Sequence, residues 1–225
     1  MYDGKVKLTK RQIKEDKFTT FVLSSRQHVS DNWQFLVIGI VVVILIGVAG
    51  AYYLDSQKEA ALRESDSYAR AMMEYRSGNL QVALASLTQA IETISDKGLL
   101  EKSIYALGNI NFETRNYPEA IRYWEMYIAQ FHDNPLNRSA AMAGLASVYE
   151  NQAQFAEAAT NFVEAAAAFE DGPLEGDYLA GAVRNYLLVG DIEQARAQLG
   201  VIEEKYESTE LYKRVARNFA EKSQP

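Results

Sequence analysis

The longest apolar run in the chain extends from Phe35 to Leu54 and contains no charged side chain. An α-helix rises about 1.5 Å per residue, so a run of this length spans roughly 30 Å, the thickness of a bilayer's hydrocarbon core. Trp33 precedes the run, and Tyr52 and Tyr53 stand close to its other end. Amphipathic rings favour the headgroup region, so these three aromatics are predicted to lie at the membrane interfaces. The pattern predicts a transmembrane helix over residues 35–54.

Two other readings of the run are a buried core helix and the core of a cleavable signal peptide. Ala49-Gly50-Ala51 imitates a cleavage site between small residues. The core of a signal peptide is usually about 7 to 15 residues long, whereas this run is longer and 34 residues precede it. We therefore expect an uncleaved signal anchor in a single-pass membrane protein.

Basic residues are concentrated before the run. Residues 1–34 contain seven Lys and Arg, whereas the twenty residues after Leu54 contain three. Cytoplasmic flanks carry the excess of basic residues, so the N-terminus is predicted to be cytoplasmic and residues 55–225 extracytoplasmic. That part holds 16 of the 23 basic and 26 of the 30 acidic side chains. Its net negative charge argues against nucleic-acid binding.

After the run, small and bulky apolar residues recur with a fixed period. Alanines lie 37, 38 and 37 residues apart, and each is followed four residues later by a bulky apolar residue. A small side chain lets two antiparallel helices approach closely, and a large one four residues on fills the adjacent gap. The pattern predicts stacked helix pairs. The alanines are Ala83, Ala120, Ala158 and Ala195, and the bulky residues are Leu87, Trp124, Phe162 and Leu199.

Helix-ending residues divide residues 55–225 into four predicted pairs and a final helix. The pairs cover about 57–97, 101–131, 138–170 and 177–206, and the final helix covers about 210–222. Residues 55–77 contain no Gly or Pro, so the apolar helix is expected to continue unbroken into the first pair and to end at Gly78-Asn79. Lys97-Gly98 is expected to end the second helix of that pair.

The residues of these pairs resemble the tetratricopeptide signature, in which Leu-Gly is followed by Tyr, then by Ala, a bulky residue and Pro. The matching residues are Leu107-Gly108, Leu145-Ala146, Tyr149, Tyr186, Pro135 and Pro173. The two prolines lie about three residues later than in a repeat of roughly 34 residues, so each second helix is expected to gain about one turn. The resemblance implies an all-α solenoid of about four helix pairs, with an amphipathic C-terminal cap that carries Leu211, Val215 and Phe219 on one stripe.

In such a solenoid the first helix of each pair lines a concave surface. The candidates for binding a polypeptide there are Tyr68, Met72, Tyr75, Lys102, Tyr105, Asn109, Phe112, Glu150, Asn151 and Arg184. Aromatic side chains among polar ones suit peptide capture. The alternative for Tyr68, Met72 and Phe112 is a place in the core or against the cap. Lys102 and Asn109 lack a basic counterpart on the next repeat, which disfavours a ligand held by its C-terminal carboxylate.

Few residues suited to catalysis are present. The chain has no cysteine, which excludes disulfides, thiolate metal sites and a Cys nucleophile. Its two histidines, His28 and His132, fall on opposite sides of the predicted membrane. No Gly-rich phosphate loop, paired-histidine motif or nucleophile elbow occurs in the sequence. We therefore predict no catalytic, metal or cofactor-binding residue, and we expect that the chain is not an enzyme.

Residues 1–34 form a basic arm with helical character. Thr9 to Gln12 matches a capping box, and apolar residues recur after it with loosely helical spacing. The arm is expected to form an amphipathic helix whose basic side faces anionic lipid. The alternative is that Lys7 to Phe21 docks on a cytoplasmic partner.

The order of these parts, with Lys7 to Arg11 and Lys14 to Phe18 in the arm, resembles the YfgM-type ancillary subunits of the bacterial Sec translocon. The resemblance implies a non-enzymatic scaffold in the inner membrane, whose periplasmic repeats contact a membrane-anchored chaperone and emerging client polypeptides. In the membrane, Gly39, Gly47 and Gly50 are expected to allow close helix approach. The alternative is a structural or assembly subunit of another envelope complex, in cell-wall synthesis, division or energy conversion.

Overall fold

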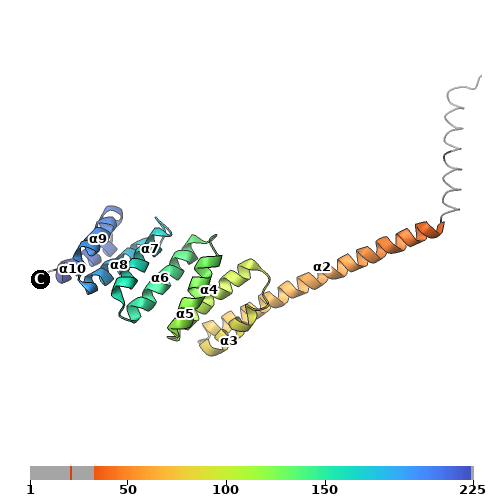
Figure 1. The fold of residues 1–225 in the computed structure, drawn as a ribbon, viewed down its shortest axis with the longest axis horizontal. Helices are drawn as coiled ribbons and strands as arrows, with labels where there is room; N and C mark the ends of the chain where they lie inside the picture. Colours follow the sequence, from red (N-terminus) through yellow and green to blue (C-terminus); the bar gives the residue numbers. More distant parts are fainter. Residues whose placement is uncertain (1–20, 22–32, 224–225) are drawn as a thin grey trace, which may run out of the picture. The chain divides into compact units, whose positions relative to one another are not determined.

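The computed structural model of the protein describes residue 21 and residues 33–223. This described part is helical and contains no strand, which confirms the predicted all-α class. Contacts divide the chain into two units, Met1–Ala60 and Ala61–Pro225. The helices of Figure 1 are α2 (Trp33–Arg76), α3 (Leu80–Ala90), α4 (Lys97–Glu113), α5 (Tyr117–Gln130), α6 (Pro135–Asn151), α7 (Phe155–Ala167), α8 (Glu175–Val189), α9 (Ile192–Tyr206) and α10 (Glu210–Lys222).

In the first unit, α2 presents apolar side chains that nothing in the described chain covers. Every side chain described between Trp33 and Glu59 is exposed. The most apolar window of α2 has a mean hydropathy of 2.8, and among the described residues α2 is the one helix long and apolar enough to cross a membrane. It continues without a break to Arg76, as predicted. The capping box at Thr9 to Gln12 and the predicted amphipathic helix of the arm lie outside the described residues.

In the second unit, consecutive helices form pairs: α2 with α3, α4 with α5, α6 with α7, and α8 with α9 (Figure 1). The four periodic alanines, Ala83, Ala120, Ala158 and Ala195, are all 0% exposed. Of the bulky residues that follow them, Leu87, Trp124 and Phe162 are buried and Leu199 is half-buried. Small and large side chains thus interlock at each helix crossing, which confirms the predicted series of helix pairs.

One residue with positive φ recurs in the turn inside each pair. Gly78, Arg115, Ala153 and Gly190 have φ angles of 82°, 60°, 58° and 79°. They are separated by 37, 38 and 37 residues, the same intervals that separate the buried alanines. Glycine adopts this left-handed conformation freely. At Arg115 and Ala153 the backbone is strained, because their Cβ atoms disfavour a positive φ.

The start of α4 corrects one prediction. The carboxylate of Asp96 accepts a hydrogen bond from the Leu99 N–H at 2.7 Å. A capping carboxylate satisfies an otherwise unpaired N–H in the first turn, so Lys97 and Gly98 begin α4. The prediction that Lys97-Gly98 ends the preceding helix is therefore wrong, and α3 already ends at Ala90.

The extra length of the repeat does not lie in the second helices. Helices α4 and α6 each have 17 residues, whereas α5 and α7 have 14 and 13. The prediction that each second helix gains a turn is wrong because Pro135 starts α6 instead of closing α5. Asn134 caps α6 by accepting the Asn137 N–H at 3.1 Å. Proline suits the first position of a helix because its missing N–H would have no partner there.

Helix α10 closes the C-terminal side of the stack. It packs against α8 and α9. Its Val215 and Phe219 are 5% and 7% exposed, while Lys213, Arg214 and other charged side chains point to solvent. This arrangement of one buried stripe under a polar surface confirms the predicted cap.

Candidate functional site

The residues predicted to bind a polypeptide lie on the first helices of the four pairs, and we call them the first-helix surface. Helix α2 carries Tyr68, Met72 and Tyr75; α4 carries Lys102, Tyr105, Asn109 and Phe112; α6 carries Glu150 and Asn151; and α8 carries Arg184.

The α2 part of the first-helix surface is fixed by packing. Tyr68, Met72 and Tyr75 are half-buried and pack against the core of the first two pairs. The Tyr75 hydroxyl donates a hydrogen bond to Glu113 Oε1 at the end of α4. Burial, and after it this hydrogen bond, raises the pKa of Tyr75 to about 12. Tyr75 therefore stays protonated to a higher pH than an ordinary tyrosine, and its hydroxyl connects α2 to α4.

Three of the four α4 residues of the first-helix surface contact α5 directly. The Tyr105 ring lies 5.4 Å from that of Tyr127, and the Phe112 ring lies 5.7 Å from that of Trp124. Asn109 Oδ1 accepts a hydrogen bond from the Trp124 indole N–H at 3.3 Å. These three side chains are half-buried, whereas Lys102 is exposed. Packing within the pair therefore orients the aromatic side chains and leaves part of each at the surface.

A charged contact joins the third and fourth pairs. The Arg184 guanidinium of α8 donates two hydrogen bonds to the Glu150 carboxylate of α6, at 2.6 and 2.7 Å. The bond to Glu150 raises the pKa of Arg184. Asn151, beside Glu150, is exposed, and its amide donates to the Ser147 carbonyl at 2.7 Å. The predicted residues Glu150 and Arg184 are thus paired with each other, and the Asn151 side chain lies at the surface.

Two carboxylates that the sequence did not indicate hold tyrosines of this region. Besides Glu113, Glu101 of α4 accepts a hydrogen bond from the buried Tyr127 hydroxyl at 2.6 Å. Contacts between neighbouring pairs join residues about one repeat apart: Tyr75 and Glu113 are 38 residues apart, and Glu150 and Arg184 are 34 apart. This spacing, searched for polar residues as well as apolar ones, would have indicated Glu113.

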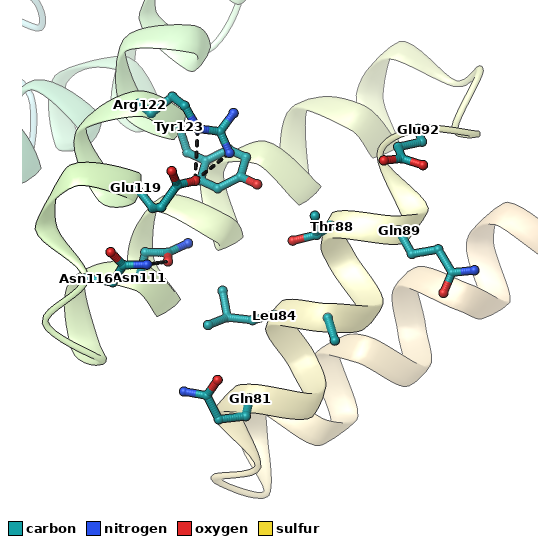
Figure 2. A pocket seen from close by; sticks show the side chains of 11 residues that line it. Gln81, Leu84, Thr88, Gln89, Glu92, Asn111, Asn116, Glu119, Arg122 and Tyr123 are labelled. Atoms are coloured by element: carbon teal, nitrogen blue, oxygen red, sulfur yellow. Dashed lines mark hydrogen bonds and ion pairs between the residues drawn. The ribbon is translucent and has the colours of Figure 1, made fainter.

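A groove that the sequence did not indicate lies between α3 and α5 (Figure 2). Its volume is about 660 Å³. Gln81, Thr88 and Gln89 line it from α3, and Asn116 and Arg122 line it from the other side. Groups that both donate and accept hydrogen bonds, as amides and hydroxyls do, suit a polypeptide main chain. The sequence signal was the polar or small face of α3 at every third or fourth residue, which a search confined to first helices overlooks.

Two interactions fix the far wall of this groove. The Asn116 amide donates to Asn111 Oδ1 at 3.0 Å, and Asn111 itself is buried, donating to the Leu107 carbonyl at 2.8 Å. The Arg122 guanidinium donates to the Glu119 carboxylate at 2.6 and 2.9 Å, as the dashed lines in Figure 2 show. Arg122 therefore already has an anionic partner on its own helix.

The predicted interface aromatics lie in α2 with exposed rings. Trp33, Tyr52 and Tyr53 are 57%, 78% and 63% exposed.

No metal-binding cluster of His, Asp and Glu occurs in the part of the chain that the structure describes. His132 lies after α5, where its Nδ1 is 2.8 Å from an Arg138 guanidinium nitrogen, and His28 lies outside the described residues.

The profile of a family described as "Tetratricopeptide repeat-like domain" matches residues 26–197. No protein of curated function matches the chain.

Solved structures similar to this chain contain tetratricopeptide repeats. A Podosopora anserina protein described as a kinesin light chain with nearly identical TPR-like repeats is 19% identical, with a TM-score of 0.54 over 71% of this chain and 85% of that one. A variant of that protein is 17% identical, with a TM-score of 0.53 over 71% and 84%. A tetratricopeptide repeat protein of Parabacteroides merdae is 16% identical, with a TM-score of 0.58 over 71% and 62%. At identities this low, the similarity supports the shared fold and nothing more.

Proposed function

Because the chain belongs to the family of tetratricopeptide repeat-like domains, we propose that it is a membrane-anchored, non-enzymatic scaffold for polypeptide partners. Stacked helix pairs of this kind offer an extended surface to which a partner chain can bind. The observation that carries the proposal is that the described part of the chain contains both an exposed apolar helix long enough to cross a bilayer and four helix pairs.

The proposed anchor is the apolar part of α2, in a bacterial inner membrane, with residues 1–34 cytoplasmic and residues 55–225 periplasmic. The basic residues before Trp33 favour this orientation. A hollow of about 410 Å³ lies over Gly39 and is flanked by Phe35, Ile40 and Val43. A glycine of this kind lets a neighbouring transmembrane helix approach closely, which favours lateral association with a membrane protein.

The proposed partner-binding site is the first-helix surface. Lys102 and Asn151 are exposed, and the half-buried Tyr105 and Phe112 are held in place by α5. Rings fixed in this way lose little conformational entropy on binding, and polar neighbours fix the register of a bound chain. An extended polypeptide is therefore the ligand that these residues suit best.

The specific assembly that we propose is the Sec translocon, with periplasmic chaperones or emerging clients on the repeats. The support for it is the resemblance of the arm and of the order of parts to ancillary translocon subunits. A scaffold anchored beside the channel would bind polypeptides as they emerge.

Topology is tested with a reporter that is active only outside the cytoplasm, fused after Pro225. We expect the reporter to be active, and we expect protease added to spheroplasts to digest the repeats. A silent reporter together with protection from protease would contradict the periplasmic location and remove the proposed partners.

Partner binding is tested by co-purification from gently solubilised membranes. We expect translocon subunits or a periplasmic folding factor with the wild-type chain, and a loss of the folding factor with Lys102→Ala plus Asn151→Ala. Glu157→Ala plus Thr160→Ala, which changes exposed residues of second helix α7, is the matched control. Recovery of a cell-wall, division or energy-converting complex instead would replace the translocon in this proposal.

A further inference from the structure

The two ends of the helix stack differ in how they meet solvent. At the C-terminal end, α10 buries Val215 and Phe219 under a polar surface. At the other end, no described element covers the outer side of the pair formed by α2 and α3. The three most exposed large apolar side chains of the second unit are all in this pair: Leu62, Met73 and Val82 are 69%, 64% and 52% exposed. Repeat stacks require a cover at each end, so this surface is incomplete.

On α2 three exposed apolar side chains form a stripe along one helix face. Leu62, Ala69 and Met73 are all exposed and follow one another at intervals of seven and four residues, which places them on a single helix face. Ala71, which is 0% exposed, lies on the opposite face, against the core. Intervals of seven and four residues are those by which one helix packs against a second helix along its length.

A hollow lies beside this stripe, between α2 and α3. Its volume is about 390 Å³, and it is lined by Ser67 and Arg70 of α2 and by Ser86, Gln89 and Ala90 of α3. Arg70 forms an ion pair with Asp66 one turn away. The same surface therefore carries protruding apolar side chains, a hollow that can receive them, and charges of both signs.

We propose that this surface, formed by Leu62, Ala69, Met73 and the hollow beside them, binds the same surface of a second copy of this chain. In a two-fold interface the same surface of both copies is in contact. Each copy must therefore supply both the protruding side chains and the hollow that receives them, and charges of both signs. This surface supplies the protruding side chains and the hollow, and its Arg70–Asp66 pair adds no net charge that would repel a second copy. The inference rests on the proposed anchoring, because two copies held in one membrane meet at a high effective concentration.

The absence of cysteine from the chain makes the interface directly testable. Ala69→Cys and Ala85→Cys place single thiols at two exposed alanines of the same helix pair, the first in the stripe and the second in the groove facing α5. The full-length variants are reconstituted in lipid vesicles without other proteins and oxidised. A disulfide forms only where two Cα atoms come within about 7 Å, so we expect at least about tenfold more dimer from Ala69→Cys.

A second variant checks that the surface itself is responsible. Met73→Glu added to Ala69→Cys places an additional charge in the stripe and is expected to return the cross-link to the Ala85→Cys level. Met73 is exposed, so the helical circular dichroism should stay unchanged. Equal cross-linking by Ala69→Cys and Ala85→Cys would overturn the proposal. So would an adduct in native membranes formed only with a different protein. Vesicle flotation reports the anchoring separately, so a chain that floats without dimerising refutes the dimer and leaves the proposed scaffold standing.

Discussion

The indole of Trp124 lies between two glycines of consecutive first helices, Gly108 of α4 and Gly144 of α6. A Cβ atom on Gly108 would lie 2.5 Å from Cδ1 of Trp124, and one on Gly144 would lie 2.7 Å from Cη2. Real Cβ atoms do not approach other atoms so closely. Trp124 is 3% exposed and has no room to withdraw. The second and third pairs therefore pack closely because the Trp124 ring fills the space that the two glycines leave free.

Gly108→Ala and Gly144→Ala are each expected to lower the free energy of unfolding by up to about 2 kcal/mol. Overpacking a core costs about 1–3 kcal/mol or more, which exceeds the gain of about 1 kcal/mol in helix propensity. Urea denaturation followed by circular dichroism measures both variants. Gly200→Ala in α9 is the control, because nothing lies within 4 Å of its added Cβ, and it should raise the free energy of unfolding. If all three variants behaved alike, the contact with Trp124 would have no energetic weight.

Part of this contact was predictable from the sequence. Gly108 stands in a Leu-Gly pair at the position where helices cross, and Trp124 follows the buried Ala120 by four residues. Gly144 gave no such signal, because it contacts a ring from the preceding repeat. Periodicity reports which face of a helix is buried, but not which residue of the next pair fills the gap.

Replacing the two strained turn residues with glycine should stabilise the fold. Arg115 and Ala153 occupy the left-handed region, at a cost of about 1–2 kcal/mol each, and glycine relieves it at a smaller entropic cost. We expect Arg115→Gly and Ala153→Gly each to raise the free energy of unfolding by about 0.5–1 kcal/mol, measured by urea denaturation.

Two controls separate strain from other effects of glycine. Ala156→Gly makes the same substitution at the exposed second residue of α7 and should cost up to about 1 kcal/mol. Gly190→Ala, whose Cβ meets nothing within 4 Å, should lower stability through backbone strain alone. If Ala153→Gly lowered the free energy of unfolding as much as Ala156→Gly does, the backbone at Ala153 would not be strained.

Helix boundaries were predictable where local signals agreed. The prediction of 210–222 for the last helix coincides with α10, because the apolar stripe of Leu211, Val215 and Phe219 marks the same residues; in the structure Thr209 caps the start. At α4 the signals conflicted, since Lys97-Gly98 resembles a helix end while Asp96 caps a start. Residues between two neighbouring helices can extend either one, and only packing in the folded chain decides which helix includes them.

The candidate site was predictable only as a set of outward positions. The spacing on the first helices places Lys102 and Asn151 at the surface, where the structure has them. It could not supply the partners of Tyr75 or Arg184, because these depend on the distance between two packed helices and on side-chain rotamers. The groove between α3 and α5 was missed for the same reason.

A buried oxygen without a partner offers a third test. Asn185 is 0% exposed, and its Oδ1 has no hydrogen-bond partner in the described chain, while its Nδ2 donates to the Gly181 carbonyl at 2.9 Å. A buried unpaired polar atom costs about 1–3 kcal/mol. Asn185→Leu should therefore leave the free energy of unfolding unchanged or raise it by up to about 1 kcal/mol.

Asn111→Leu is the matched control for that variant. Asn111 is equally a buried amide of a first helix, but its Oδ1 accepts from Asn116 and its Nδ2 donates to the Leu107 carbonyl. Its loss should lower stability by about 1 kcal/mol, because both hydrogen bonds disappear. Equal destabilisation of the two variants in urea denaturation would show that the Asn185 oxygen is in fact satisfied.

The hydrogen bond between Tyr75 and Glu113 predicts a specific alkaline response. Burial and the Glu113 carboxylate raise the pKa of Tyr75 from 10.0 to about 12 in the folded chain. A group whose pKa is raised on folding stabilises the fold fully below its unfolded pKa, and this contribution disappears as the pH rises through the folded pKa. The stability difference between wild type and Tyr75→Phe should therefore be constant below pH 10 and decline toward pH 12. Urea denaturation at several pH values measures it, and taking the difference removes the titration of other groups. With Glu113→Gln as the background the decline should be smaller, since burial alone then raises the pKa. A decline of equal size in the two backgrounds would mean that Glu113 does not hold the Tyr75 hydroxyl in solution, and a difference that stays flat would contradict the raised pKa itself.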